Sequence, residues 1–145
     1  MNEFLEKFEK MRIAGKLAAQ TLDMLTDNIK EGVSTAYIDK LGYEFIRDNG
    51  GYSAPLFYRG FKKSICTSVN HVVCHGIPGE KILNDGDVVN IDVTLILDGW
   101  HGDTSRMYSA GEPSIKSKNL IILQLIFRLF SFLENLHSDE FLFVQ

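Results

Sequence analysis

Residues 90–105, NIDVTLILDGWHGDTS, indicate the central structural feature of this chain. Apolar and polar side chains alternate on both sides of the dipeptide Asp98-Gly99. Both residues of that dipeptide tolerate a positive φ, which a two-residue hairpin turn requires. The stretch therefore predicts two antiparallel strands, over residues 88–97 and 100–109, joined by a tight turn.

The turn fixes which side chains share a face of this hairpin, because side chains in a strand alternate with a period of two. In this register Thr94 faces Asp103, and Asp92 faces Ser105. We expect one face to be apolar and buried, with Val89, Ile91, Val93, Leu95 and Leu97. The other face is polar and consists of Asn90, Asp92, Thr94, His101, Asp103 and Ser105.

Asp92 and Asp103 are diagonal neighbours on the polar face. Diagonal Cα atoms in a sheet lie about 7–8 Å apart, so the two carboxylates can converge. Two such charges repel, and either one accepts a proton or both share a cation. Oxygen ligands suit Mn²⁺, Mg²⁺ or Ca²⁺, and an added imidazole extends the choice to Fe, Co and Zn. Solvated acids on an exposed sheet face, or a carboxylate pair for glycoside hydrolysis, are the alternatives that the spacing leaves open.

The composition limits the kinds of partner. The chain has 145 residues, of which 45% are hydrophobic, as expected for one globular domain or half of a larger one. A net charge of −4 and the lack of a basic cluster argue against DNA or a membrane surface as partner. The charged first residues contain no apolar signal region, so we expect the cytoplasm, where Cys66 and Cys74 would be free thiols.

Upstream of the hairpin the sequence predicts two helices. Residues 3–29 have helical periodicity, and residues 35–48 form a second candidate with Ser34 or Thr35 as N-cap. Short extended segments are predicted at residues 52–57 and 64–70. The apolar stripe of the first helix contains Phe4, Phe8, Met11, Ala14, Leu17, Ala18, Leu22 and Leu25. The second helix is expected to bury Ile38, Leu41, Phe45 and Ile46. The fold class is therefore α+β, an antiparallel sheet with two helices.

The composition changes after about residue 119. None of the 12 glycines lies beyond that point. Residues 120–133 are strongly apolar, but the run is too short and too interrupted by Gln124 and Arg128 to span a membrane. One interpretation is a buried helix. The other is that residues 119–145 are an atypical tail that did not evolve with residues 1–118 and marks a frameshift or a truncated reading frame.

Several runs of this sequence, in this order, resemble the N-terminal half of bacterial-type (type I) methionine aminopeptidases: EKMRIAGKLAAQTL (9–22), EGVST (31–35), VVCHGIPG (72–79), DGDVVNIDV (85–93) and DGWHGDTSRM (98–107). The resemblance extends over roughly residues 4–118. It implies half of the pita-bread fold, in which two similar αβ halves surround a central site. It also implies a cytoplasmic enzyme that removes the N-terminal methionine of nascent polypeptides, with two divalent metal ions (Co, Mn, Fe or Zn) and with the ribosome as a further partner.

The resemblance assigns roles to individual residues. Asp92 and Asp103 correspond to the two aspartate metal ligands of the family. His75, within CHGIP, corresponds to the catalytic histidine that contacts the substrate near the scissile bond.

The resemblance also implies a pocket for the methionine side chain. Tyr58 and Cys66 correspond to positions that line it, and we expect Phe61 and Trp100 to help close it. A thioether suits aromatic and thiol surroundings. Core packing is the alternative role for Tyr58, Phe61 and Cys66.

The sequence departs from the family after residue 118. The family completes its metal site with a histidine and two glutamates from the second half of the fold, and this chain has no run that matches them. Glu134 and His137 show the Glu-x-x-His spacing of di-iron bundles, followed by Asp139 and Glu140, although a polar patch between apolar runs explains them as well. We therefore expect weak metal binding and impaired activity.

Two alternative functions remain. One is a non-catalytic pita-bread module that binds a peptide or a partner, and the other is one half of a split enzyme. The presence of Asp92, Asp103 and His75 favours descent from a catalytic protein.

Overall fold

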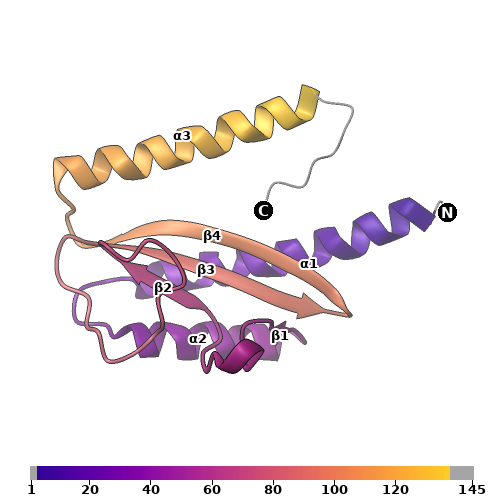
Figure 1. Ribbon diagram of the computed structural model, residues 1–145, viewed down its shortest axis with the longest axis horizontal. Coiled ribbons are helices and arrows are strands. Elements are labelled where there is room, and N and C mark those ends of the chain that lie inside the picture. The colour runs from indigo at the N-terminus through magenta and orange to yellow at the C-terminus, as the bar shows by residue number, and fades with distance from the viewer. Residues whose placement is uncertain (1–2, 138–145) are drawn as a thin grey trace.

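Figure 1 shows the computed structural model, which describes residues 3–137, with side chains for residues 3–127, 129 and 130. It is an α+β fold in which an antiparallel sheet is packed against helices, as the sequence predicts. The elements, in chain order, are α1 (Glu3–Leu25), the 3₁₀ turn η1 (Thr26–Asn28), α2 (Thr35–Asp48), β1 (Tyr52–Ser53), the 3₁₀ turn η2 (Tyr58–Gly60), β2 (Cys66–Val69), β3 (Asp87–Leu97), β4 (Trp100–Ala110) and α3 (Ile115–His137).

Strand β3 is the centre of the sheet. It pairs with β4 along one edge, and with β1 and β2 at successive positions along the other, all antiparallel. The β3–β4 register pairs Leu97 with Trp100, Thr94 with Asp103 and Asp92 with Ser105. Asp98 and Gly99 form the turn with φ angles of 51° and 83°. The predicted hairpin is confirmed, and each strand extends one residue beyond the predicted outer end.

The apolar face of the hairpin forms the core. Val89, Ile91, Val93 and Leu95 are fully buried, and Leu97 is half-buried. Helices α1 and α2 cover this face (Figure 1), and the polar side chains lie on the opposite face of the hairpin. Burial of apolar side chains is the main contribution to folding, so the alternation in sequence determines which face becomes polar.

Helix α1 comes unusually close to β4 at Gly102. A Cβ atom at this position would lie 2.3 Å from the backbone oxygen of Ala14. Only glycine permits such an approach, because every other residue would place a carbon atom inside the helix backbone. Gly102 therefore fixes the distance between the helix and the sheet.

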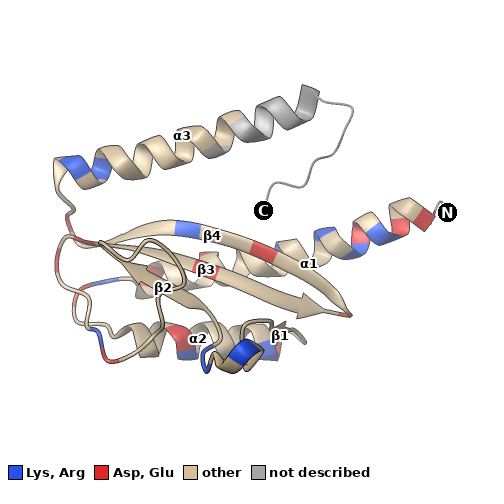
Figure 2. Cartoon of the chain, viewed as in Figure 1, with Lys and Arg blue, Asp and Glu red and all other residues tan. Residues whose placement is uncertain are grey.

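The first part of α1 is not covered by the sheet, although the apolar stripe predicted for this helix begins at Phe4. Buried positions begin at Ala14, whereas Phe4 and Phe8 are 63% and 37% exposed. Figure 1 shows that this end of α1 extends past the strands. Ion pairs Glu3–Lys7 and Glu6–Lys10 lie along it, and Figure 2 shows charges of both signs there.

Helix α2 has the predicted bounds, and its N-cap is Ser34, whose Oγ accepts from the Tyr37 N–H at 3.1 Å. Ile38 and Ile46 are buried, and Leu41 and Phe45 are half-buried. The predicted extended segments are shorter than expected, since β1 is Tyr52–Ser53 and β2 is Cys66–Val69. Residues 54–61 instead form turns that reach the polar face.

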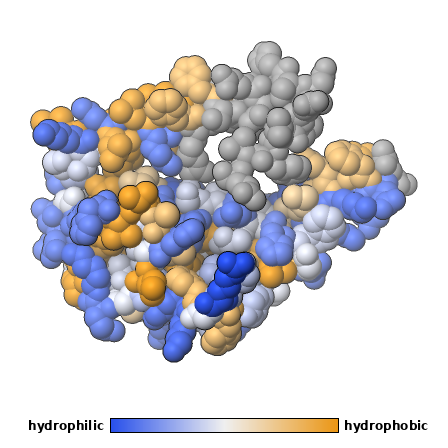
Figure 3. All heavy atoms as spheres, in the orientation of Figure 1, coloured by the Kyte–Doolittle hydropathy of each residue, from blue (hydrophilic) through white to orange (hydrophobic). Residues whose placement is uncertain are grey.

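Helix α3 begins at Ile115 and continues across residue 119. The helix itself agrees with one of the two interpretations of this segment, but the expected burial is wrong for the side chains that are described. Leu120, Leu125 and Phe127 are 60%, 53% and 70% exposed, and apolar side chains are visible along α3 in Figure 3.

The tail also bears on two other expectations. In the part of the chain that the structure describes, no helix is both long enough and apolar enough to cross a membrane. The side chains of Glu134 and His137, together with Asp139 and Glu140, lie outside the described residues, so the structure does not bear on the Glu-x-x-His hypothesis.

Candidate active site

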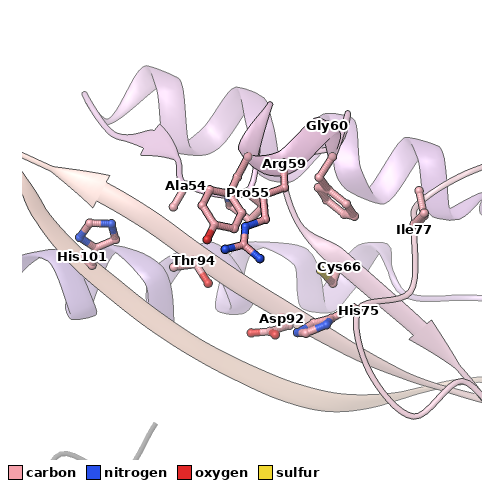
Figure 4. Close-up of a pocket in the computed structure, with 12 residues that line it drawn as sticks. Ala54, Pro55, Arg59, Gly60, Cys66, His75, Ile77, Asp92, Thr94 and His101 are labelled. Atoms are coloured by element: carbon pink, nitrogen blue, oxygen red, sulfur yellow. The ribbon is translucent and has the colours of Figure 1, made fainter.

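The polar face of the hairpin borders a pocket of about 700 Å³. Its floor comes from the sheet, where β3 contributes Asp92 and Thr94, β2 contributes Cys66, and β4 contributes His101. Two irregular segments form its walls: the turns around η2, over residues 54–61, and the loop that leads from β2 to β3. Figure 4 shows these side chains converging on one space.

Asp92 and Asp103 lie on the same side of the sheet, as the alternation predicts. Asp92 is half-buried on β3, and Asp103 is exposed on β4, where it accepts a hydrogen bond from Thr94 Oγ1 at 3.0 Å. Burial raises the pKa of Asp92, and the nearby charge of Asp103 raises it further, while His75 acts in the opposite direction. The two carboxylates therefore interact, and a cation between them would relieve that repulsion.

His75 lies in the loop between β2 and β3, beside Asp92 (Figure 4), consistent with its effect on the pKa of that carboxyl. Its backbone has a φ of 53°, in the left-handed region that few residues other than glycine adopt. The structure thus brings together the histidine and one of the aspartates that the sequence singled out. An imidazole at this place can exchange a proton with a group held in the pocket.

Cys66 pairs with Asp92 across β2 and β3, so its thiol faces the pocket floor. Only 8% of Cys66 is exposed. Burial raises its pKa to about 11, with a further contribution from the charge of Asp92. The thiol therefore stays protonated at neutral pH, which makes it a poor nucleophile.

Tyr58 and Phe61 both line the pocket, Tyr58 with 64% of its surface exposed and Phe61 half-buried. Trp100 does not line it, which corrects the expectation that it helps to close the methionine pocket. Trp100 pairs with Leu97 and packs against the hydrophobic core, because these two positions belong to the apolar face of the hairpin.

Arg59 is a pocket residue that the sequence analysis missed. It lies in the η2 turn with a φ of 47°, and its guanidinium carbon is 5.4 Å from the centre of the Tyr58 ring. Its side chain points into the pocket (Figure 4). The run Tyr58-Arg59-Gly60 contains a turn-forming glycine, which was the one available indication that this segment bends over the site.

The donor atoms fit part of a divalent metal site. Carboxylate oxygens, with an imidazole nearby, suit Mn, Fe, Co or Zn. Among residues whose placement is described, however, no group of three or more His, Cys, Asp or Glu side chains could hold a metal ion. Asp92 and Asp103 can therefore supply two ligands, and further ligands have to come from elsewhere.

Comparison with known proteins places most of this chain in a family. Residues 9–126 match Metallopeptidase family M24. The methionine aminopeptidase of Rickettsia prowazekii (strain Madrid E) is 61% identical over 114 residues, which are 79% of this chain and 44% of that protein. The methionine aminopeptidase of Escherichia coli (strain K12) is 51% identical over 117 residues, with the same two shares.

The solved structures agree with this result. The crystal structure of methionine aminopeptidase from Rickettsia prowazekii superposes with a TM-score of 0.79 at 60% identity, and the match covers 80% of this chain and 47% of that chain. The present chain thus spans about 44% of the length of the curated relatives that it matches.

Proposed function

The chain belongs to metallopeptidase family M24, and on this premise we propose that it supplies the N-terminal part of a methionine aminopeptidase active site. One observation carries the proposal. Asp92 and Asp103 lie on one side of the β3–β4 hairpin, and His75 lies beside Asp92. The charge of Asp103 raises the pKa of Asp92, and His75 lowers it. Asp92 and His75 line the pocket, and Asp103 lies on the same face of the sheet beside it. Such a cluster in this family supports metal-assisted peptide hydrolysis.

In this proposal Asp92 and Asp103 hold a pair of divalent ions (Co, Mn, Fe or Zn). When bound, the ions would polarise the scissile carbonyl and lower the pKa of water. Burial is the main cause of the raised pKa of Asp92, and the charge of Asp103 raises it further. The cations would offset this second, repulsive contribution. The protein's own part is to hold both carboxylates on a rigid two-stranded hairpin.

His75 is proposed to act on the substrate directly. Its imidazole lies in the pocket wall next to Asp92, where it can donate to or accept from the peptide group and assist proton movement. Tyr58, Phe61 and Cys66 are proposed to contact the methionine side chain, since a thioether packs well against aromatic rings and a protonated thiol.

The proposed substrate is the N-terminal methionine of a nascent polypeptide. We expect the protein to act in the cytoplasm on chains that emerge from the ribosome. The 145-residue chain by itself is expected to be impaired, because its described residues provide two carboxylate ligands and no larger metal-binding group.

Metal titration tests the proposal. Isothermal titration of Mn²⁺ into the chain should give a weak binding event that disappears in Asp92→Asn and in Asp103→Asn. Asp98→Asn is the matched control, because Asp98 lies on the same hairpin but in its turn, where asparagine tolerates the φ of 51°. Equal binding by all four proteins would refute the proposed metal site.

A further inference from the structure

The loop over residues 70–79, which contains the pocket histidine, is fastened to the domain at both ends. At its start, Asn70 Nδ2 donates to Asp87 Oδ1 at 2.8 Å. At its end, the Gly79 N–H donates to Thr35 Oγ1, and the same hydroxyl donates to the Gly79 carbonyl, both at 3.0 Å. These contacts fix where the loop begins and ends, but they do not determine the position of the residues between.

His75 lies between these anchors in a conformation that it would not adopt freely. Its φ of 53° is strained for a residue with a Cβ atom, and such a conformation persists only where the surroundings impose it. The next residue provides the restraint. The Gly76 carbonyl accepts from the Thr67 N–H at 2.8 Å, and the Gly76 N–H donates to Ser68 Oγ at 3.1 Å.

The loop touches β2 at this point. A Cβ atom at Gly76 would lie 2.2 Å from the Thr67 carbonyl oxygen and 2.9 Å from the Ser68 Cα. Ser68 itself is only 4% exposed. It pairs with Asn90, so its hydroxyl is on the same side of the sheet as Asp92, beneath the loop.

We propose that Ser68 is a positioning residue that holds His75 against Asp92. Its buried hydroxyl binds the backbone immediately after the histidine and so fixes the strained turn that directs the imidazole into the pocket. Loss of this acceptor would leave the Gly76 N–H without its partner and would release the middle of the loop. The inference rests on the proposed function, because it gives Ser68 its role through the role of His75.

Three variants of the full chain test this role. Ser68→Ala removes the acceptor, and Ser68→Thr keeps a hydroxyl in a strand position that suits a β-branched side chain. Ser53→Ala is the matched control. Ser53 is just as buried, at 2% exposed, but its hydroxyl has no hydrogen-bond partner among the described residues.

NMR spectroscopy supplies two readouts that a purely structural serine would not change. One is amide hydrogen exchange at Gly76, and the other is the set of NOEs from the His75 ring to the β-protons of Asp92. In Ser68→Ala we expect exchange at Gly76 to accelerate about tenfold and the NOEs to disappear. Ser68→Thr and Ser53→Ala should retain both. NOEs that persist in Ser68→Ala would overturn the inference.

The unaltered chain decides the question if Ser68→Ala does not fold. Val73 is in the same loop and is 93% exposed. The Gly76 amide should exchange at least about tenfold more slowly than the Val73 amide, because only Gly76 is bound to the strand. Equal exchange rates would refute the role of Ser68. None of these measurements requires metal. A failure of the metal titration would therefore refute the proposed function and leave the positioning role of Ser68 to be decided by the NMR measurements.

Discussion

Burial raises the pKa of Asp39, Asp92 and Cys66, but the neighbouring groups differ: they offset the effect of burial at Asp39 and add to it at Asp92 and Cys66. The Asp39 carboxylate accepts from the Ser64 and Ile65 N–H groups, which partly offset the effect of burial. Asp92 instead faces another carboxylate, and Cys66 faces Asp92, so their repulsion adds to the effect of burial. Asp39 thus fastens the entry to β2, whereas the repulsion at Asp92 is what the proposed cations would relieve.

Asp39 should make stability depend on pH. Because its pKa is raised in the folded state, the folded protein binds the proton more readily than the unfolded chain does. Its contribution to stability is therefore largest below about pH 4 and declines as pH rises through the raised pKa. Asp39→Asn should remove this dependence. Urea denaturation of both proteins between pH 4 and pH 7.5 measures it.

Asp39→Ala is the companion variant, because it removes the acceptor as well as the charge. Two buried N–H groups would lose their partner, and we expect a loss of about 2–4 kcal/mol at pH 7, larger than for Asp39→Asn. If both variants were destabilised equally at every pH, the carboxyl group would have no special role at this position.

The β3–β4 hairpin could be predicted almost completely from its sequence. A two-residue turn and strict alternation of apolar and polar residues allow only one strand register. Alternate residues then point to opposite faces, so the members of each face are determined. The same alternation assigns Trp100 to the core, and the expectation that it would help to close the pocket failed because it ignored that rule. Helix α2 was also predictable, since a capping serine and an asparagine-glycine ending define its limits.

Other features depend on contacts that no local pattern encodes. The helical period of α1 continues through Phe4 and Phe8, although the strands do not extend far enough to cover them. Arg59 enters the pocket only because residues 54–61 turn back over the sheet. Asp92 and His75 were associated through a resemblance of motifs, since the loop geometry that joins them is not visible in spacing alone.

The close contact between α1 and β4 predicts that adding one methyl group at Gly102 will destabilise the fold. Gly102→Ala would place a Cβ atom against the Ala14 backbone, which cannot move without shifting the helix. We expect a loss of about 3 kcal/mol or more, at the upper end of overpacking effects. Gly99→Ala is the control, because Gly99 has a φ of 83° but nothing within 4 Å, so only backbone strain of about 1–2 kcal/mol applies. Thermal unfolding should rank the two variants in this order, and equal losses would show that the helix can adjust.

The molecule as a whole presents surfaces that an isolated domain usually covers. Strand β4 has a partner on one edge only in the part of the chain that is described. The exposed apolar side chains of α3 include Leu120, Leu125 and Phe127. Unpaired edges and apolar patches of this kind favour association. The chain spans about 44% of the length of its curated relatives.

The last prediction concerns the activity of the 145-residue chain purified alone. We expect little or no aminopeptidase activity and a tendency to self-associate. Water is activated by a metal ion only when that ion is firmly held, and the described residues offer Asp92 and Asp103 without a larger ligand group. The assay uses Met-Gly-Met with added Mn²⁺, Co²⁺ or Fe²⁺, and sedimentation measures the association.

Asp92→Asn separates genuine turnover from a contaminating enzyme. Activity that depends on metal and is lost in Asp92→Asn would contradict the prediction, and it would mean that the remaining ligands come from residues 131–145 or from a second copy of the chain. The dependence of activity on protein concentration would then choose between these two sources, because ligands from a second copy require activity to rise more steeply than in proportion to protein concentration over the range where sedimentation shows association. Ligands from the same chain would leave specific activity independent of concentration.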